Sequence, residues 1–573
     1  MSKITLTIDN QEVQVESGKT VLEAAREVGI NVPTLCYHPD LTLHGSCRVC
    51  VVENVDNNRL VASCVTPAVD GMKISTRSSR ARKARKANVE LLLANHPNDC
   101  LGCDRNGTCE LQDITHEMGI VREDVEQFAG DKRDLAVDAT GPSLKRDPNK
   151  CILCGRCVRV CEEVQGVSAL QFSDRGFNSI VTTAFDLPQS EINCANCGQC
   201  ASVCPVGAIT ELSEINNVWA ALEDSDKHVV VQTAPTIQAT IGEEFGMEPG
   251  SVVTGKLVAA LRRLGFDTVF STEFSADLTI LEEGNEFIER VKGDKNLPHI
   301  TSCCPGWVKF AEHNYPDLLN HLSSAKSPQQ MFSAIAKTYY ANKIGIDKRD
   351  IFTVSIMPCT AKKFEKEREE HHDSGCQDTD AVLTTRELAR MISEVGIDFV
   401  NLPDEDYDEI MGDVTGAGTI FGTTGGVTEA ALRTVKEVLT GEGLEKLNLG
   451  FRGITEAEVA IEGKVYNIAV ASGLGNAAKL LDEVKAGTSK FDWIEVMACP
   501  HGCVGGGGQP LPVSNEKKAK RAKGLASIDK SNKIRKSHEN PDVMKLYEDF
   551  LGEPLSGQAH HLLHTTYHKR DKN

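Results

Sequence analysis

Cysteine is the residue type in this sequence that is best placed to do chemistry. Fifteen of its 21 cysteines lie before residue 205, in tight groups. The first residues alternate apolar and polar side chains, with neither a twin arginine nor a basic segment followed by an apolar one, so we expect no export signal. In a large cytoplasmic chain, grouped cysteines favour metal binding over disulfides.

The first group has the spacing C-x10-C-x2-C-x13-C and comprises Cys36, Cys47, Cys50 and Cys64. Four thiolates in the loops of one small β-rich domain can hold a 2Fe–2S cluster. A zinc site is the alternative. Structural zinc sites usually use two CxxC pairs, and this group has one, so we favour the cluster.

The second group has the spacing H-x3-C-x2-C-x5-C and comprises His96, Cys100, Cys103 and Cys109. A neutral imidazole can replace one thiolate on a 4Fe–4S cluster, which changes the charge and potential of the cluster. Zinc is again the alternative. Without the three cysteines that follow it, His96 would be an ordinary surface histidine.

Two further groups repeat the run C-x2-C-x2-C-x3-C, which is typical of bacterial two-cluster ferredoxins. In such proteins the fourth cysteine of each run ligates the other cluster. One predicted 4Fe–4S site therefore comprises Cys151, Cys154, Cys157 and Cys204. The other comprises Cys194, Cys197, Cys200 and Cys161.

The later cysteines are scattered, but several follow strand-like segments. Cys359 ends IFTVSIMPC, Cys499 ends WIEVMACP, and Ala234 and Pro235 end HVVVQTAP. In open α/β sheets, ligands bind at the carboxyl ends of strands, so these segments would deliver thiolates and small residues to one crevice. Each cysteine alone would be taken for a buried structural residue. Together, four can supply a fifth cubane: Cys304, Cys359, Cys499 and Cys503.

Three segments resemble the signature loops of iron-only (FeFe) hydrogenases: TSCCPGW (301–307), MPCTAKKFE (357–365) and EVMACPHGCVGGGGQP (495–510). The resemblance extends over essentially the whole chain, because the cysteine groups match the long members of that family in order. It implies an H-cluster, which is a 4Fe–4S cubane joined to a two-iron unit with CO, cyanide and a bridging dithiolate amine. The same four cysteines would hold the cubane, and Cys503 would also bridge to the two-iron unit.

The resemblance also assigns residues around this cluster. Lys362 would lie near a cyanide ligand, where its positive charge would stabilise the anionic ligand. The lining positions of the family fall on Met357, Met497, Ala234, Pro235, Ser327, Gln329 and Phe421.

A proton route is implied as well. Its residues are Cys303, Glu283, Glu286, Ser323 and Arg290. Cys303 would hand protons to the bridging amine, and thiols are reactive and sensitive in pKa, as a relay needs. The two glutamates and the arginine have helical i, i+3, i+7 spacing, so they share one helix face. Without the resemblance, that pattern would indicate only a solvated face. Cys376 is assigned no role.

The elements that position these residues predict a multidomain protein of α+β and α/β class. We expect a plant-type ferredoxin-like β-grasp domain at 1–78, a 4Fe–4S domain with one histidine and three cysteine ligands at 79–140, a bacterial two-cluster ferredoxin domain at 141–215 and a large α/β hydrogenase domain at 216–573. From about 216, short apolar strands alternate with helices, which predicts mostly parallel sheets. The basic run 77–86 and the lysine-rich stretch 517–523 are interpreted as structural or solvent-facing.

Composition excludes several function classes. The net charge of −20 disfavours a nucleic-acid partner. No apolar run reaches the roughly 18 residues of a membrane helix, so we expect a soluble cytoplasmic protein without a membrane partner. The segment GAGTIFGTTGG (416–426) lacks G-x-G-x-x-G spacing, so we do not interpret it as a dinucleotide loop. Its glycines more simply let backbone approach the cluster.

Three alternatives and one open question remain. LCYHPDLTLHGSCRVC and the His96 group also resemble complex I-type subunits, so an electron-wire subunit of a dehydrogenase is one alternative. A non-catalytic iron–sulfur assembly protein and a hydrogen sensor are the others. The substrates would be hydrogen and protons. The electron partner is either ferredoxin or a set of flavin- and NAD(P)-binding subunits.

The ligand groups predict the metal content of the mature protein. One 2Fe–2S cluster, three accessory 4Fe–4S clusters and the H-cluster together hold about 20 iron atoms per chain. Iron and zinc analysis of fully matured, active protein checks this number. Stoichiometric zinc at the Cys36 or His96 group in such a preparation would contradict the assignment there.

Overall fold

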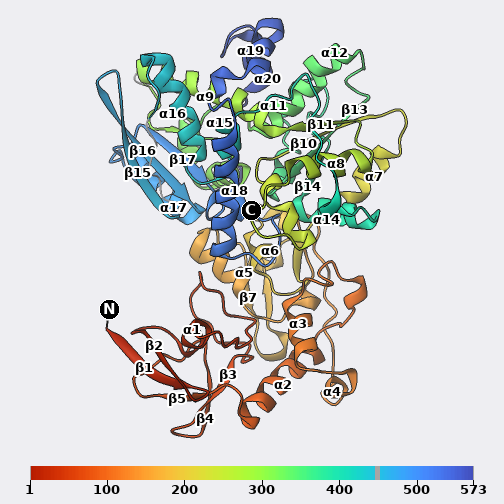
Figure 1. Ribbon diagram of the computed structural model, residues 1–573, viewed down its shortest axis with the longest axis vertical. Helices are drawn as coiled ribbons and strands as arrows, with labels where there is room; N and C mark the ends of the chain where they lie inside the picture. The colour runs from red at the N-terminus through yellow and green to blue at the C-terminus, as the bar shows by residue number, and fades with distance from the viewer. Residues whose placement is uncertain (1, 294, 445–451, 572–573) are drawn as a thin grey trace.

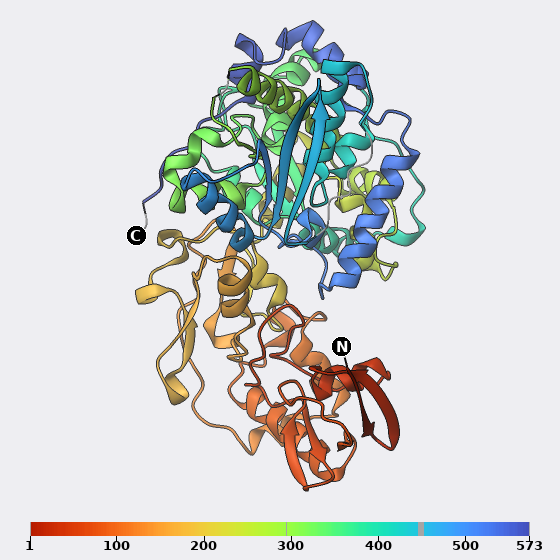
Figure 2. The ribbon, with the colours of Figure 1, turned by 90° about the vertical axis from the view of Figure 1, so that its left-hand side faces the viewer.

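The computed structural model describes residues 2–293, 295–444 and 452–571. Figures 1 and 2 show two lobes joined by a waist. The red and orange N-terminal modules form the lower lobe, and the chain after about residue 215 forms the larger upper one. The yellow-orange ferredoxin-like segment lies between them.

The first module is a five-stranded sheet in the order β2-β1-β5-β3-β4. Its strands alternate buried and exposed residues, as expected for a sheet with one face on a core. Helix α1 (Val21–Glu27) covers it and begins with a capping box between Thr20 and Glu23. The strands are β1 (Lys3–Ile8), β2 (Gln11–Glu16), β3 (Val51–Asn54), β4 (Arg59–Ala62) and β5 (Lys73–Ser75).

Most of the basic run lies on α2 (Ser79–Ala94). The ferredoxin-like segment that follows is internally repeated. Helices α5 (Arg156–Arg159) and α6 (Gln199–Val203) each begin after a glycine in the left-handed region, Gly155 at φ 69° and Gly198 at φ 70°. Strands β6 (Leu144–Arg146) and β9 (Ile209–Glu211) pair to close the segment.

Two four-stranded sheets form the upper lobe. The first, β11-β10-β13-β14, is parallel throughout, as predicted. Its strands are almost wholly buried, which parallel strands require because helices cover both faces. They span β10 (His228–Thr233), β11 (Thr268–Ser271), β13 (Ile351–Met357) and β14 (Ala381–Thr384).

The second sheet has the order β12-β17-β16-β15. Its first three strands are parallel, and the edge strand β15 is antiparallel to β16. They span β12 (His299–Ile300), β15 (Ile454–Ile461), β16 (Lys464–Ser472) and β17 (Trp493–Met497).

The long helix α9 (Thr272–Gly293) begins directly after β11 and is buried over most of its length. It packs against α11 (Pro328–Ile335) and α16 (Gly426–Thr440). The other helices that cover the sheets include α8 (Thr254–Leu264), α14 (Thr385–Glu394) and α17 (Leu474–Lys485). Among the described residues, no helix is long and apolar enough to cross a membrane.

The lysine-rich stretch lies on α18 (Asn515–Ser531), which runs down the middle of the view in Figure 1. It is less solvent-facing than the sequence suggested. Arg521 is fully buried, pairs with Glu243 at 2.6 Å and donates to the Val504 carbonyl at 2.9 Å. The helix therefore supports the loop that carries Cys503.

Candidate cluster sites and central cavity

A cavity of about 90 Å³ lies at the carboxyl ends of strands from both upper sheets. One water needs roughly 10–15 Å³, so the cavity has room for a small polyatomic group. The residues after β10, β12, β13 and β17 all contribute to its wall. This is the crevice that the strand-end pattern predicted.

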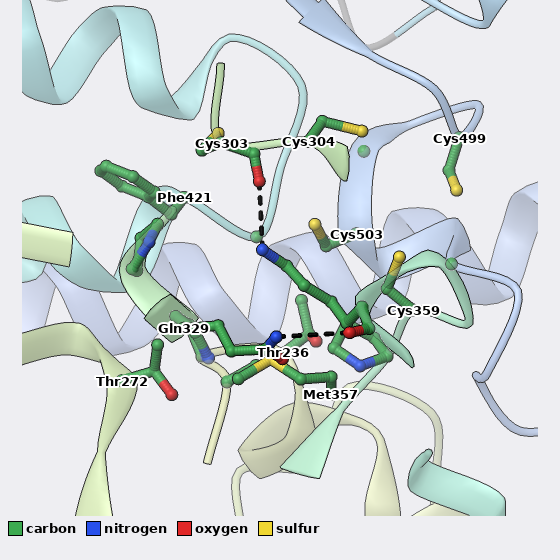
Figure 3. A pocket seen from close by; sticks show the side chains of 18 of the residues that line it. Thr236, Thr272, Cys303, Cys304, Gln329, Met357, Cys359, Phe421, Cys499 and Cys503 are labelled. Carbon is green, nitrogen blue, oxygen red and sulfur yellow. Dashed lines mark hydrogen bonds between the residues drawn. The ribbon is translucent and has the colours of Figure 1, made fainter. Parts of the chain in front are cut away.

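Four cysteines from three loops face this cavity: Cys304, Cys359, Cys499 and Cys503. Figure 3 shows their sulfur atoms around a shared space. Burial raises the pKa of the Cys359 thiol to about 12 and raises the pKa of Cys503 further. The Cys304 sulfur accepts a hydrogen bond from the Ala498 N–H at 3.4 Å. Convergent thiols that burial keeps protonated suit a cubane, because iron replaces the protons that burial otherwise retains.

Most of the other predicted lining residues also contact the cavity: Ala234, Pro235, Gln329, Met357, Phe421 and Met497. Ser327 does not. Its hydroxyl instead donates to Glu365 at 2.9 Å. Thr236, Thr272 and Ala276 line the wall as well, and sequence reasoning did not name them.

Lys362 contributes a fixed positive charge to the wall. Its ammonium donates to the Cys303 carbonyl at 3.2 Å and to Glu365 at 2.8 Å. Burial alone would lower the pKa of this lysine, but the adjacent Glu365 carboxylate outweighs burial and the pKa is raised. Lys362 is therefore charged at neutral pH.

Glu365 is a functional residue that sequence reasoning missed. Besides Lys362, it accepts hydrogen bonds from Ser327 and from the Gln329 amide at 3.1 Å. It is 4% exposed. The available signal was its position three residues after Lys362 in the same short helix, α13 (Ala361–Glu365).

Three residues of the predicted proton route, Arg290, Glu286 and Ser323, are joined by direct contacts. Glu283, Glu286 and Arg290 lie on α9, as predicted. Arg290 pairs with Glu286 at 2.6 Å, and the Ser323 hydroxyl donates to the same carboxylate at 2.7 Å. Glu283 is fully buried, so the interpretation as a solvated face is wrong.

Cys303 faces the cavity, within electrostatic reach of the first of these carboxyls. Burial raises the pKa of its thiol well above the usual range, and the negative charge of Glu283 adds to the rise. The thiol therefore carries its proton at neutral pH. A protonated thiol next to a buried carboxyl has the chemistry of a proton relay.

The ferredoxin-like segment holds two separate cavities. One is lined by Cys151, Cys154, Cys157 and Cys204. The other is lined by Cys161, Cys194, Cys197 and Cys200. These are the two sets in which the spacing paired the cysteines, with the fourth member of each run in the opposite set.

In the first module, all four cysteines of the predicted 2Fe–2S site are buried. The Cys50 and Cys64 sulfur atoms lie 3.3 Å apart. Hydrogen bonds from Cys47 and Cys64 lower the pKa of Cys36. A compact group of buried thiols fits a small cluster.

His96 is buried, and burial lowers its pKa, so the ring is neutral. Its Nδ1 accepts from the Asn98 N–H at 3.2 Å, and its Nε2 has no hydrogen-bond partner in the described part of the chain. A buried neutral imidazole nitrogen without a partner fits a metal ligand. A Cβ on Gly207 would lie 2.6 Å from the Cys103 sulfur, so glycine lets the ferredoxin-like segment approach this group.

Both outer groups touch the same inner segment. Arg159 on α5 donates to the Cys36 carbonyl at 2.7 Å. Arg105, two residues after Cys103, donates to the Cys204 carbonyl at 3.0 Å. The first module and the His96 group thus reach the ferredoxin-like segment by separate contacts.

The inner segment in turn packs on the cavity loops. A Cβ on Gly198 would lie 2.4 Å from the Thr360 hydroxyl, which itself donates to the Asn196 carbonyl at 2.7 Å. The Gln199 amide donates to the Gly505 carbonyl at 2.9 Å. One set of ferredoxin-like cysteines therefore lies directly behind the central cavity.

The glycines of the segment 416–426 let its backbone lie close to neighbouring residues. Part of it forms α15 (Gly416–Ile420). A Cβ on Gly422 would lie 2.5 Å from Thr236, and one on Gly418 would lie 2.7 Å from the Glu273 carbonyl. Cys376 lies away from every cluster group, with its sulfur 3.4 Å from the Ser374 hydroxyl.

The role of Glu365 leads to a prediction about assembly. Glu365→Gln removes the charge that holds Lys362, so we expect the purified variant to accept markedly less of the two-iron unit. Glu367→Gln changes an exposed residue of the same segment and serves as the matched control. Infrared CO and cyanide band intensity per cubane measures the loading. Equal loading of both variants would contradict the role of Glu365.

Comparison with known families assigns every module. Residues 227–507 match the C-terminal domain of the iron only hydrogenase large subunit, and 515–570 match the iron hydrogenase small subunit. Residues 1–79 match a 2Fe–2S iron–sulfur cluster binding domain. Residues 85–123 match the NADH-ubiquinone oxidoreductase-G iron–sulfur binding region, and 141–210 match the ferredoxin-like domain of NADH-quinone oxidoreductase subunit 3.

Individual relatives agree. The NADP-reducing hydrogenase subunit HndD of Solidesulfovibrio fructosivorans is 49% identical over the full length of both chains. Iron hydrogenase 1 of Clostridium pasteurianum is 41% identical over 99% of this chain and all of its own. A solved apo FeFe-hydrogenase from Chlamydomonas reinhardtii is 42% identical with a TM-score of 0.57, and covers 62% of this chain and 99% of its own. The chain belongs to the iron-only (FeFe) hydrogenase family and carries N-terminal iron–sulfur domains of the NADH-quinone oxidoreductase type.

Proposed function

We propose that this chain is the hydrogen-activating subunit of an NAD(P)-linked hydrogenase assembly. It would catalyse the reversible oxidation of hydrogen and reduction of protons at an H-cluster in the central cavity. The observation that carries the proposal is the convergence of four cysteine thiols, a charged lysine and a protonated thiol on one apolar cavity.

The cavity residues would each have a distinct task. Cys304, Cys359, Cys499 and Cys503 would hold the cubane, and Cys503 would also help to hold the two-iron unit. When bound, that unit supplies a low-valent metal centre for cleaving hydrogen and a nearby amine that takes up a proton. The two methionines, the phenylalanine and the alanine–proline pair exclude water from it. Lys362, fixed by Glu365, offers a positive charge to a cyanide ligand.

Protons would pass along α9. Cys303 exchanges a proton with the amine on the cavity side and with Glu283 on the other. Glu283 exchanges with Glu286 by way of the Ser323 hydroxyl, which already donates to Glu286 at 2.7 Å. Burial would raise the pKa of the Glu286 carboxyl, but the nearby charges of His299 and Arg290 and hydrogen bonds from Ser323 and Ser324 lower it.

Electrons would pass through one 2Fe–2S and three accessory 4Fe–4S clusters, held by the Cys36 group, the His96 group and the two ferredoxin-like sets. The domain assignments remain those of the sequence: a plant-type β-grasp ferredoxin at 1–78, the one-histidine, three-cysteine cluster domain at 79–140, a two-cluster ferredoxin at 141–215 and the hydrogenase domain at 216–573. The packing of Gly198 against Thr360 supports the last step to the cavity.

The partner assignment rests on the N-terminal modules. Three of them match families of NADH-quinone oxidoreductase or 2Fe–2S type, and the full-length relative is a subunit of an NADP-reducing hydrogenase. Flavin- and NAD(P)-binding partner subunits would therefore accept the electrons, with ferredoxin as the alternative or additional carrier. The expected location is the cytoplasm.

Adjacent cysteines separate ligand from proton carrier. Cys304→Ala removes a cubane ligand, so we expect the H-cluster to be lost. Cys303→Ala removes none, so the CO and cyanide infrared bands should persist while hydrogen evolution falls about 10²–10⁴-fold, the usual contribution of a placed proton donor. Cys303→Asp keeps a titratable group and should retain more turnover. Near-normal turnover of Cys303→Ala would remove the relay assignment.

The partner proposal predicts what the isolated chain cannot do. Purified and matured alone, it should reduce a viologen dye with hydrogen but should not reduce NAD(P). Addition of co-purified native partners should restore NAD(P) reduction. Direct NAD(P) reduction by the single chain would contradict the proposal, because that reaction requires a nicotinamide site within the chain.

A further inference from the structure

His299 lies on the short strand β12, paired in register with Trp493 on β17. It is 0% exposed. Its ring stacks on the Trp493 ring with centroids 4.8 Å apart and planes 24° apart, and the Phe287 ring meets its edge at 5.8 Å. The imidazole is therefore fixed in orientation by rings on two elements.

One polar atom of this ring faces the Glu283 carboxyl, and the ring also acts electrostatically on Glu286. Its Nε2 lies 3.5 Å from Oε1 of Glu283, which is also 0% exposed. Neither ring nitrogen of His299 and neither carboxylate oxygen of Glu283 has a hydrogen-bond partner elsewhere in the described chain. Buried polar groups are normally satisfied, so two unsatisfied groups facing each other indicate a functional contact.

A second buried carboxyl, that of Glu495, increases the need for a donor to the Glu283 carboxylate. Glu495 is buried near Glu283, and the charge of Glu283 adds to the burial that raises the pKa of Glu495 to about 7. The Glu495 oxygens are already occupied by the N–H groups of Gly425 and Thr428. A negative charge on Glu283 thus forms in a dry region beside another acid, where a donor for it has a strong effect.

We propose that His299 is the positioning residue of Glu283, with its Nε2–H donating to the carboxylate whenever Glu283 is ionised. The proposal deepens the proton route under Proposed function and rests on it. When Glu283 gives its proton to the Cys303 thiolate, a carboxylate forms and the Nε2–H contact closes. When Glu283 regains a proton from the Glu286 side, the contact relaxes. His299 keeps its own proton throughout, so charge and protons balance.

This role differs from simple ring packing. A packing residue can be replaced by phenylalanine without effect on the carboxyl, because the stack on Trp493 needs only a flat ring. A positioning residue cannot, because Glu283 then loses its donor. Glutamine has no ring but offers an N–H, and should recover part of the function.

The test compares His299→Phe, His299→Gln and the control Phe287→Leu, which removes the ring contact on one side of His299 and changes no polar atom. We expect His299→Phe to keep its H-cluster infrared bands and lose about 10–100-fold in hydrogen evolution, as is usual when the partner of a functional group is removed. Its solvent isotope effect should rise. His299→Gln should fall between His299→Phe and wild type, and Phe287→Leu should stay near wild type.

A second readout needs no loaded active site. In protein that carries its cubanes but lacks the two-iron unit, the Glu283 carboxyl infrared band is identified by its loss in Glu283→Gln. At a pH where wild-type Glu283 is ionised, we expect His299→Phe to leave the carboxylate without its donor, so that Glu283 binds a proton and its band moves to higher frequency; Phe287→Leu should leave the band in place.

The outcomes separate the two proposals. An unmoved band together with equal turnover of His299→Phe and Phe287→Leu would overturn the role of His299. Full turnover of Glu283→Gln would overturn the proton route itself. A band shift in His299→Phe would then still establish the contact between the two side chains.

Discussion

The burial of uncharged thiols around a dry cavity is the constraint on which the rest of this structure depends. Burial holds the pKa of each thiol in the wall above its usual range, so these side chains ionise only when iron displaces their protons. Lys362 is the one charged side chain among the described residues that line the wall. Its position is therefore controlled tightly, by the nearby Glu365 carboxylate.

The architecture follows from the same constraint. An apolar cavity that carries out the proposed reaction would have to exchange protons and electrons, and the proposed routes would leave by different walls. Helix α9 begins at the cavity with Thr272 and Ala276 and carries the acidic residues away from it. The opposite wall is formed by loops that rest on the ferredoxin-like segment through Gly198 and Gln199. Molecular hydrogen is small and apolar, so it would need neither the proton route nor the electron route.

Local sequence spacing made the cluster groups predictable, because a CxxC loop brings its own sulfur atoms together. The strand ends of the parallel sheets were also predictable from their apolar runs. Contacts between segments far apart in the sequence could not be predicted in this way. Glu365 looked like an ordinary helix residue, and His299 like a residue of a short apolar strand. His299 faces Glu283 on α9, and Glu365 contacts Ser327 and Gln329, and no periodicity in the chain encodes these contacts. The burial of Arg521 was hidden in the same way by a lysine-rich stretch.

The separate contacts of the Cys36 and His96 groups with the ferredoxin-like segment have a consequence for electron transfer through the protein. Hydrogen yields its electrons as a pair, whereas each iron–sulfur station changes charge by one. An unbranched chain of clusters would have to pass two electrons in succession through one terminal cluster before the next turnover. A branched chain of clusters would have two ends, so the two electrons could leave the shared clusters and reside on different branches. If the proposed clusters occupy these groups, separate contacts of this kind would let the two electrons of one turnover leave the ferredoxin-like segment by different modules.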